Sequence, residues 1–232
     1  MKKLIVLTGA GISAESGIST FRDSGGLWEQ YRIEDVATPQ AWRRDPELVL
    51  RFYNQRRQQL HTVEPNPGHT ALVDLEQAFD VHVITQNVDD LHERAGSRQV
   101  LHLHGELRKV RSEGHPDLIY DRMDDVLLGD CCDRGFQLRP HIVWFGEEVP
   151  MLLPAAQLAS EAAVFLIIGT SLQVYPAAGL MAYAPQHIPY YYVDPNPQLN
   201  WELQQMPNLT VLAEPASSGV PKLVRELLKQ LD

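Results

Sequence analysis

The sequence has few cysteines and no long hydrophobic run. Its two cysteines, Cys131 and Cys132, are adjacent, so they cannot form the disulfide framework of a small secreted protein. No apolar run approaches the roughly 20 residues that a membrane-spanning helix needs. The run after Met1 is also shorter than the roughly 7 to 15 residues of a signal-peptide core. We therefore expect a cytoplasmic protein that has no membrane partner.

The sequence also lacks an excess of positive charge. Its 30 aspartates and glutamates outnumber 20 lysines and arginines, for a net charge of −10 at pH 7. Nucleic-acid-binding surfaces are basic, so no direct nucleic-acid binding is expected, whereas a basic, lysine-bearing partner is mildly favoured. With 232 residues, 44% of them hydrophobic, the chain is long enough for one globular domain with a small insertion.

A glycine-rich turn follows the first apolar run. Leu4–Leu7 has the length and branching of a buried parallel strand. Gly9, Gly11 and Ala14 then have the G-x-G-x-x-G/A spacing with which a backbone approaches a dinucleotide pyrophosphate at a helix N-terminus. The spacing alone also fits a plain tight connection. The polar, glycine-containing segment that continues to Gly26 is suited to closing over a ligand.

Strand-like and helix-like segments alternate through the rest of the chain. The expected strands are 81–85, 101–105, 140–146, 164–168, 188–193 and 209–212, and the expected helices are 46–61, 69–79 and 220–231. This alternation predicts an α/β fold, a doubly wound parallel sheet of the Rossmann type, in one domain of residues 1–232. A helical insertion at 28–62 and an irregular, charged stretch at 108–137 interrupt it and should form a small lobe.

Polar side chains gather where several expected strands end. Gln86, Asn87 and Asp89 follow one strand, His104 stands before a glycine after the next, and Gly169–Ser171 follow a fully apolar one. Open parallel sheets bind ligands at the carboxyl ends of their strands. We therefore expect a binding pocket at this edge.

These motifs, in this order, resemble those of the sirtuins, the NAD-dependent protein-lysine deacylases. The match includes the glycine-rich turn, Gln86–Asp89, Leu103–Gly105, Phe145–Glu147 and Gly169–Ser171, and it runs from Leu4 to the last helix. The resemblance implies a sirtuin catalytic domain with NAD as cofactor and acyl-lysine proteins or peptides as substrates. The products would be nicotinamide, deacylated lysine and O-acyl-ADP-ribose.

The resemblance also assigns roles to individual residues. His104 would be the catalytic base, and Asn87 would share the catalytic work. The NAD site would comprise Gly9, Ala10, Gly11, Ser13, Glu15, Phe21, Arg22, Gln86, Asn87, Asp89, Gly169, Thr170, Ser171, Asn196 and Ala216. The acyl-lysine and its backbone would be bound by Val143, Trp144, Phe145, Gly146, Glu147, Leu172 and Val174.

The residue types suit this chemistry. A neutral imidazole with a pKa near ~6.5 can take a proton from a ribose hydroxyl, as His104 would. The amide of Asn87 and the carboxylate of Asp89 can hydrogen-bond the carboxamide of nicotinamide. A histidine at a strand end is otherwise more often structural, which is our expectation for His102, since it should point to the other side of its strand.

A Tyr-x-x-Arg pair predicts the acyl preference. Tyr53 and Arg56 lie three residues apart on one helix face, and the sirtuin class with this pair is associated with succinyl and malonyl removal. An arginine fork and a tyrosine hydroxyl can hold a carboxylate, which predicts discrimination of about 2–4 kcal/mol over acetyl. The alternative is a solvated arginine, as most neighbouring arginines should be; Arg57 is the next candidate but does not share the face of Tyr53.

The expected small lobe departs from the family. Sirtuins usually carry two Cys-x-x-Cys-like pairs for a structural zinc, and here only Cys131 and Cys132 are present. A closed tetrahedral site needs four well-placed ligands, so His115 with Asp117 or Asp130 would have to complete it. The segment therefore resembles a degenerate zinc ribbon, and we expect no metal and a lobe held by packing or partly mobile.

Other functions stay open at this point. The same NAD site could serve ADP-ribosyl transfer or NAD hydrolysis, since another nucleophile can capture an activated ribose. The chain could also be a non-catalytic NAD-sensing module. A hydride-transferring dehydrogenase is the generic expectation from the fold alone.

Overall fold

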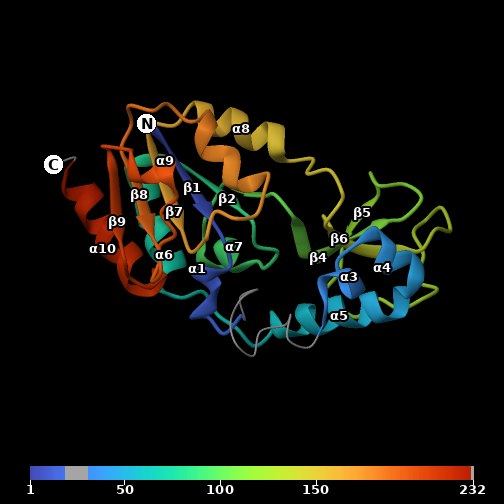
Figure 1. The fold of residues 1–232 in the computed structure, drawn as a ribbon. Coiled ribbons are helices and arrows are strands. Elements are labelled where there is room, and N and C mark those ends of the chain that lie inside the picture. Colours follow the sequence, from blue (N-terminus) through green and yellow to red (C-terminus); the bar gives the residue numbers. More distant parts are fainter. Residues whose placement is uncertain (19–30, 231–232) are drawn as a thin grey trace.

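The structure, a computed structural model, describes residues 1–18 and 31–230. It has a larger part built on a six-stranded sheet and a smaller lobe that contains a three-stranded sheet (Figure 1). Within the described residues, no helix combines the length and the hydropathy that crossing a membrane requires.

The larger sheet is parallel, with the strand order β3-β2-β1-β7-β8-β9. Its strands are β1 (Lys2–Thr8), β2 (Phe79–Thr85), β3 (Val100–His102), β7 (Val164–Ile168), β8 (Tyr190–Val193) and β9 (Leu209–Leu212). Successive strands are added on one side of β1 up to β3 and on its other side from β7 onwards. Ligands bind in the crevice at such a switch point, here between β1 and β7. The predicted doubly wound, Rossmann-like fold is confirmed.

Helices cover both faces of this sheet. Along β1, Leu4 and Val6 pack towards α6 and α10, whereas Ile5 and Leu7 pack towards α8 and η2. Both side-chain sets are therefore buried, which explains why the strand is apolar throughout instead of alternating. The helices of this part are α1 (Gly11–Ala14), α6 (Pro67–Asp74), η1 (Leu75–Gln77), α7 (Leu91–Ala95), α8 (Leu152–Ser160), η2 (Ala177–Tyr183), α9 (Trp201–Gln204) and α10 (Ala216–Lys229).

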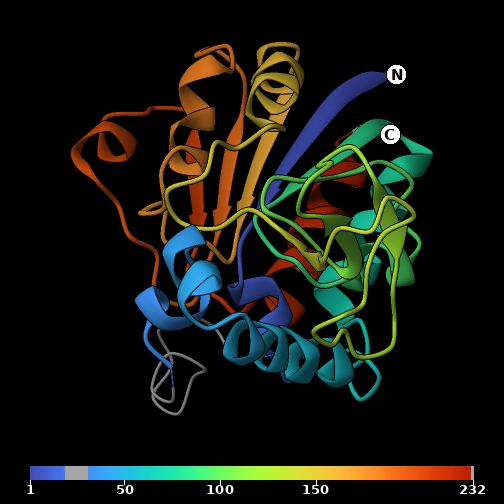
Figure 2. The same cartoon turned by 90° about the vertical axis from the view of Figure 1, so that its right-hand side faces the viewer.

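The smaller lobe combines helices from one stretch of the chain with strands from another. Its elements are α3 (Ile33–Val36), α4 (Pro39–Arg44), α5 (Pro46–Gln59), β4 (Gly105–Ser112), β5 (Ile119–Asp121) and β6 (Leu138–Ile142). The strands form an antiparallel sheet in the order β5-β4-β6 and share one hydrophobic core with the helices. The strands of the larger sheet end beside this lobe (Figure 2), so the crevice lies between the two parts.

Several element boundaries differ from the expectation. The strand expected at 101–105 is split: β3 ends at His102, and β4 begins at Gly105 in the other sheet. Gly105 makes the break possible, because its φ of 82° lies in the region that favours glycine. As a result, His104 lies on the connection between the two sheets.

Three further expectations were imprecise. The stretch expected to be irregular contains most of β4 and all of β5, because short antiparallel strands with one exposed face lack an apolar run. The last helix begins at Ala216 instead of Val220. The helix expected up to Phe79 ends at Asp74 and is followed by the 3₁₀ turn η1, so that Phe79 opens β2.

Candidate active site

A crevice lies at the carboxyl ends of β1 and β2, against α5 and β4 of the smaller lobe. Its walls are formed by Ala10, Ser13, Ile18, Arg56, Gln59, Leu60, Gln86, Asn87, Val88, Asp89 and Leu107. Residues from both parts thus line one site, and several of them carry predicted roles in binding NAD or the acyl group.

The glycine-rich turn packs directly on the end of β7. The backbone N–H of Gly9 donates to Ile168 O at 3.0 Å, and that of Gly11 donates to Gly169 O at 2.8 Å. A Cβ at Gly9 would lie 2.7 Å from Thr170 Cβ, and one at Gly11 would lie 2.7 Å from Gly169 Cα. Both glycines therefore allow a close approach between two backbone turns, and their N–H groups are not available to a phosphate. Their contact with NAD stays a prediction.

The loop after β2 has a side-chain oxygen at the crevice that accepts no hydrogen bond from a described residue. Asn87 Nδ2 donates to Gly9 O and to Ser13 Oγ, at 3.1 Å each. Ser13 Oγ donates to Asp89 Oδ2 at 3.0 Å, and the other Asp89 oxygen accepts from Leu91 N at 3.2 Å. Burial raises the pKa of Asp89, and these two hydrogen bonds oppose the rise. With its nitrogen committed, Asn87 keeps Oδ1 without a partner among the described residues.

His104 has one committed ring nitrogen and one free. Nδ1 lies 3.0 Å from Gln86 O, and because a carbonyl only accepts, Nδ1 carries the proton. Burial lowers the pKa of His104, an effect that this hydrogen bond partly offsets. The ring is therefore neutral at pH 7 and leaves the lone pair of Nε2 available, which is the state that a general base requires.

The predicted NAD residues that follow β7 and β8, and Ala216 of α10, are only partly brought together. Gln86 Nε2 donates to Thr170 Oγ1 at 3.0 Å and so joins the ends of β2 and β7. Ser171 is half-buried next to Thr170, whereas Asn196 is exposed on the loop after β8. Ala216, the first residue of α10, is buried, and neither it nor Asn196 lines the crevice.

Glu15, Phe21 and Arg22 complete the predicted NAD residues. The Glu15 carboxylate accepts from Ser217 N at 3.0 Å and from Ser217 Oγ at 2.6 Å. It therefore caps α10 and ties this helix to the glycine-rich turn. Phe21 and Arg22 lie outside the described residues.

Tyr53 and Arg56 lie on the lobe side of the site. Tyr53 is 4% exposed, and its hydroxyl oxygen accepts from Trp144 Nε1 at 3.1 Å. Burial raises the pKa of Tyr53 to about 12, so the hydroxyl keeps its proton. Arg56 lines the crevice, and its buried Nε has no hydrogen-bond partner. Burial lowers the pKa of Arg56, while electrostatic interactions with Tyr53 and Asp89 raise it.

The segment predicted to bind the substrate backbone has most of its N–H groups in use. Val143 N donates to His104 O at 2.9 Å, Phe145 N to Ala37 O at 3.0 Å, and Glu147 N to Trp144 O at 3.0 Å. Phe145 is 48% exposed. Strand pairing with a substrate stays a prediction, and it would have to rely mainly on the carbonyl groups of this segment.

Other predicted substrate residues differ in their surroundings. A Cβ at Gly146, whose φ is 90°, would meet nothing within 4 Å. Val174 is 37% exposed, and Leu172 has a φ of 53°, which is unusual for a residue with a branched side chain. Their contact with an acyl-lysine stays a prediction.

An arginine–glutamate pair supports the same segment and was not anticipated. Arg139 is 8% exposed and contacts both carboxylate oxygens of Glu147, at 2.8 and 3.1 Å, and Arg111 lies 3.3 Å from the same carboxylate. The guanidinium of Arg139 also lies 3.3 Å from the ring centroid of Trp144. The predicted contact of Glu147 with substrate therefore has no support in its geometry. Only the charged residues on either side of an apolar segment could have indicated the pair.

Arg57 was the second candidate for the acyl clamp among arginines that were mostly expected to be solvated, and it is neither solvated nor part of the crevice wall. The side chain is 0% exposed; Nε donates to Leu107 O at 2.8 Å and Nη1 to Asn54 Oδ1 at 2.8 Å. Burial lowers its pKa to about 10. Arg57 thus joins α5 to β4 inside the lobe. Helical spacing from Tyr53 does not indicate that the helix face with Arg57 is buried.

The lobe residues do not fit a structural zinc site. Cys131 is exposed, and Cys132 is buried with its thiol donating to Ser112 Oγ at 3.2 Å. Across residues 1–18 and 31–230, no group of three or more potential ligand side chains is placed to hold a metal ion.

The chain is similar to proteins of one family. The Sir2 family model matches residues 9–176. An NAD-dependent protein deacylase of Helicobacter pylori is 53% identical over 229 residues, which cover 99% of this chain and 97% of that protein. One from Bacteroides thetaiotaomicron is 53% identical over 234 residues, covering 98% of this chain and 99% of that protein. Among solved structures, a complex of a Sir2 homologue with NAD has a TM-score of 0.87 at 39% identity and covers 100% of this chain and 91% of that one.

Proposed function

This chain belongs to the Sir2 family, and from that premise we propose that it removes acyl groups from protein lysines with NAD as co-substrate. The products are nicotinamide, the free lysine and O-acyl-ADP-ribose. The observation that carries the proposal is the state of His104: Nδ1 is tied to a carbonyl, and Nε2 is free in a neutral ring beside the crevice.

The side chains on the crevice walls suit the groups of NAD that they would bind. When bound, NAD supplies a ribose carbon that accepts the acyl oxygen as nicotinamide leaves. Asn87 Oδ1 has no partner among the described residues and can accept from a carboxamide N–H, and Asp89 offers a buried carboxylate beside it. His104 Nε2 can take a proton from a sugar hydroxyl. Walls from both parts of the molecule enclose the groups that line the crevice, and such enclosure limits competing attack by bulk water.

We propose further that the enzyme prefers succinyl or malonyl to acetyl. Arg56 is a half-buried cation on the crevice wall, and among the described residues no carboxylate forms an ion pair with it, although Asp89 acts on it electrostatically. The protonated hydroxyl of Tyr53 lies close enough to interact with it. A cation that is partly removed from water without an ion-pair partner is costly. The carboxylate of a succinyl group relieves that cost and an acetyl group does not, so the discrimination of about 2–4 kcal/mol corresponds to roughly 30- to 700-fold in rate.

His104→Ala tests the reaction, with His61→Ala as the matched control because His61 is exposed on the lobe surface. NAD-dependent loss of the acyl mass from a lysine peptide should disappear in His104→Ala and persist in His61→Ala. Deacylation by His104→Ala at the parent rate would overturn the proposal. Release of free ADP-ribose without any peptide would indicate NAD hydrolysis instead.

Arg56→Met tests the acyl preference, with Arg51→Met as the control on an exposed position of the same helix. Acetyl and succinyl versions of one peptide are compared in each variant. The preference for succinyl should be lost only in Arg56→Met. If the parent prefers acetyl and Arg56→Met changes neither rate, the preference is refuted and the deacylase assignment stands.

A further inference from the structure

Two histidines hold adjacent carbonyl groups of the loop after β2. His104 Nδ1 lies 3.0 Å from Gln86 O, and His102 Nδ1 lies 2.9 Å from Asn87 O. His102 is the last residue of β3, and His104 lies on the short connection from β3 to β4. One short stretch of the chain therefore anchors two carbonyl groups of the loop that carries Asn87 and Asp89.

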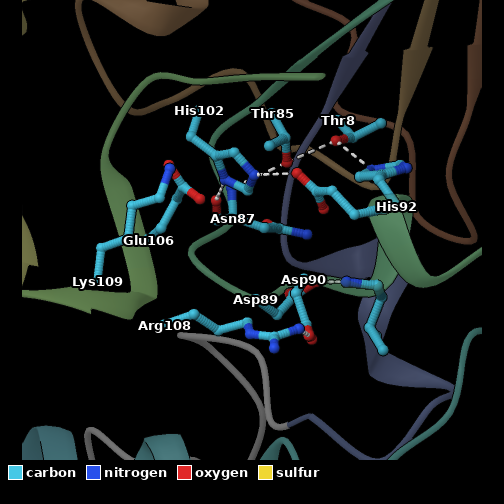
Figure 3. A network of polar contacts seen from close by, with 12 residues as sticks. Thr8, Thr85, Asn87, Asp89, Asp90, His92, His102, Glu106, Arg108 and Lys109 are labelled. Carbon is cyan, nitrogen blue, oxygen red and sulfur yellow. Dashed lines mark hydrogen bonds and ion pairs between the residues drawn. The ribbon is translucent and has the colours of Figure 1, made fainter. Parts of the chain in front are cut away.

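The second ring nitrogen distinguishes the two histidines. His104 Nε2 has no partner among the described residues. His102, which Figure 3 shows next to Asn87, has its Nε2 2.7 Å from Glu93 Oε1. Both partners of His102, a carbonyl and a carboxylate, can only accept. The His102 ring must therefore carry a proton on each nitrogen for both hydrogen bonds to exist, which makes it an imidazolium.

We propose that His102 and Glu93 are a positioning pair that holds Asn87 in its binding geometry while His102 is charged. When the ring loses one proton, the carboxylate of Glu93 keeps the other on Nε2. Nδ1 then no longer donates to Asn87 O, so that alkaline pH releases Asn87. The inference rests on the proposed function for its catalytic consequence. Its structural content, a charged ring coupled to Asn87, does not depend on the reaction.

The charges around His102 favour the charged ring. Glu93 faces it from α7, Glu106 from β4, and Asp89 lies on the same loop as Asn87. Lys109, also on β4, is bound to Glu106 at 2.7 Å and so adds little repulsion. His92 on α7 is kept neutral because burial lowers its pKa. Burial opposes these carboxylates, but the net effect raises the pKa of His102.

Asn87 depends on this anchor for the orientation of its backbone. Its N–H donates to Thr85 Oγ1 at 3.0 Å, and its side-chain nitrogen is bound to Gly9 O and Ser13 Oγ. The carbonyl is the remaining polar group, and His102 holds it. When the anchor is lost, the peptide can rotate and the free Oδ1 moves. A displacement of about 1 Å at a reacting group can cost about 100-fold in rate.

Replacing His102 by asparagine or glutamine tests its hydrogen bonds to Asn87 O and to Glu93 one at a time. In His102→Asn, the side-chain nitrogen lies near the position of Nδ1, donates to Asn87 O and does not titrate. In His102→Gln, the nitrogen lies near Nε2 and reaches only Glu93. We expect His102→Ala to lower kcat/KM for NAD by about 10- to 100-fold, His102→Asn to recover most of that loss, and His102→Gln to recover little.

The pH profile provides a readout that a purely structural role would not move. The parent kcat should fall on the alkaline side as His102 loses its proton. This fall should be absent in His102→Asn. In Glu93→Gln it should move to lower pH, because a carboxylate that favours the imidazolium is gone; solvent weakens this effect, since the Glu93 side chain is 41% exposed. The same alkaline fall in His102→Asn as in the parent overturns the inference.

Nitrogen-15 NMR separates failure of this inference from failure of the proposed function. In the parent at neutral pH, both ring nitrogens of one histidine, identified by its absence in His102→Asn, should be protonated. The side-chain amide signal of Asn87 should titrate together with that ring and should not titrate in His102→Asn. A neutral His102 at neutral pH, or an Asn87 signal that ignores its titration, overturns the inference even if the enzyme deacylates no peptide tested.

Discussion

Replacing Asn54 should destabilise the protein strongly, because this one side chain bonds two segments of the smaller lobe. Nδ2 donates to Val126 O at 2.9 Å, and Oδ1 accepts from Val126 N at 3.0 Å and from Arg57 Nη1 at 2.8 Å. Asn54 is 7% exposed, and Val126 and Arg57 are 0% exposed. Asn54→Ala would leave a buried peptide group unpaired and remove a partner from a buried guanidinium.

The cost follows from what is left without partners. A buried neutral donor or acceptor that loses its hydrogen bond costs about 1–3 kcal/mol, and charged groups cost more. Arg57 retains its bond to Leu107 O, so its loss is only partial. We expect a decrease of about 3–5 kcal/mol in the free energy of unfolding. At about 2–4 °C per kcal/mol for a chain of this size, the melting temperature should fall by roughly 6 to 20 °C.

Thermal unfolding followed by circular dichroism measures the effect, and Gln58→Ala is the matched control. Gln58 is on the same helix and also reaches the segment around Val126, donating to Asp125 at 3.1 Å, but it is exposed. Its replacement should change stability by no more than about 0.5 kcal/mol. Hydrogen exchange at Val126 N should accelerate in Asn54→Ala. Equal melting temperatures for the two variants would refute the reasoning.

Three further changes test other parts of the structure. Burial lowers the pKa of His104, and its neutral form is the active one, so kcat/KM should hold as pH falls through about 6.5 and decline only below it; a decline centred above that value contradicts the assignment. Trp144→Phe removes the donor to Tyr53 Oη and should reduce the succinyl-to-acetyl rate ratio by about 2- to 10-fold; an unchanged ratio would show that the indole does not orient the hydroxyl. Gly169→Ala should lower the melting temperature more than Gly129→Ala, because both have positive φ but only the first new Cβ would collide with backbone; equal effects would argue against the close packing of the two turns.

The parts of the fold that sequence reasoning captured are those with a local signal. A strand buried on both faces is apolar throughout, as Val164–Ile168 is. Such runs, together with strand-like runs of more mixed composition and with helical segments between them, suffice for a doubly wound sheet. The polar groups after β2 were found for a related reason. Strand ends in a parallel sheet meet at one edge, so Gln86, Asn87 and Asp89 could be placed together without knowledge of the packing.

What could not be captured depends on partners distant in the chain. Whether an arginine is solvated or buried is decided by what lies opposite, and Arg57 meets Leu107, 50 residues away. Likewise, the spacing of Gly9 and Gly11 reveals that something approaches closely, but not that it is Gly169 instead of a phosphate. The position of His104 between two sheets depends on the break before Gly105. A glycine after alternating residues does not indicate whether the following residues stay in the same sheet or begin another one.

The smaller lobe uses its polar groups both for stability and for the acyl pocket. Arg139 is bound to Glu147 and lies on the ring of Trp144, and the indole of Trp144 donates to Tyr53. The salt bridge is therefore connected to the hydroxyl that is proposed to meet the acyl carboxylate. Removing one member of a buried ion pair is costly because the other stays charged.

The consequence is that selectivity and stability cannot be altered independently at this point. Arg139→Met should lower stability, because the 3.3 Å contacts with Arg111 would be the only ion pair left to Glu147 among the described residues. It should also loosen Trp144, so that the succinyl preference falls together with the melting temperature. Arg56→Met, at the crevice end of the same arrangement, removes a charge that forms no ion pair with a described residue and that lies over the Phe52 ring, 5.5 Å from Cζ to the centroid. It should lower the preference with little change in the melting temperature. The contrast between these two variants distinguishes the residue proposed to contact the acyl group from the residue that supports the proposed pocket.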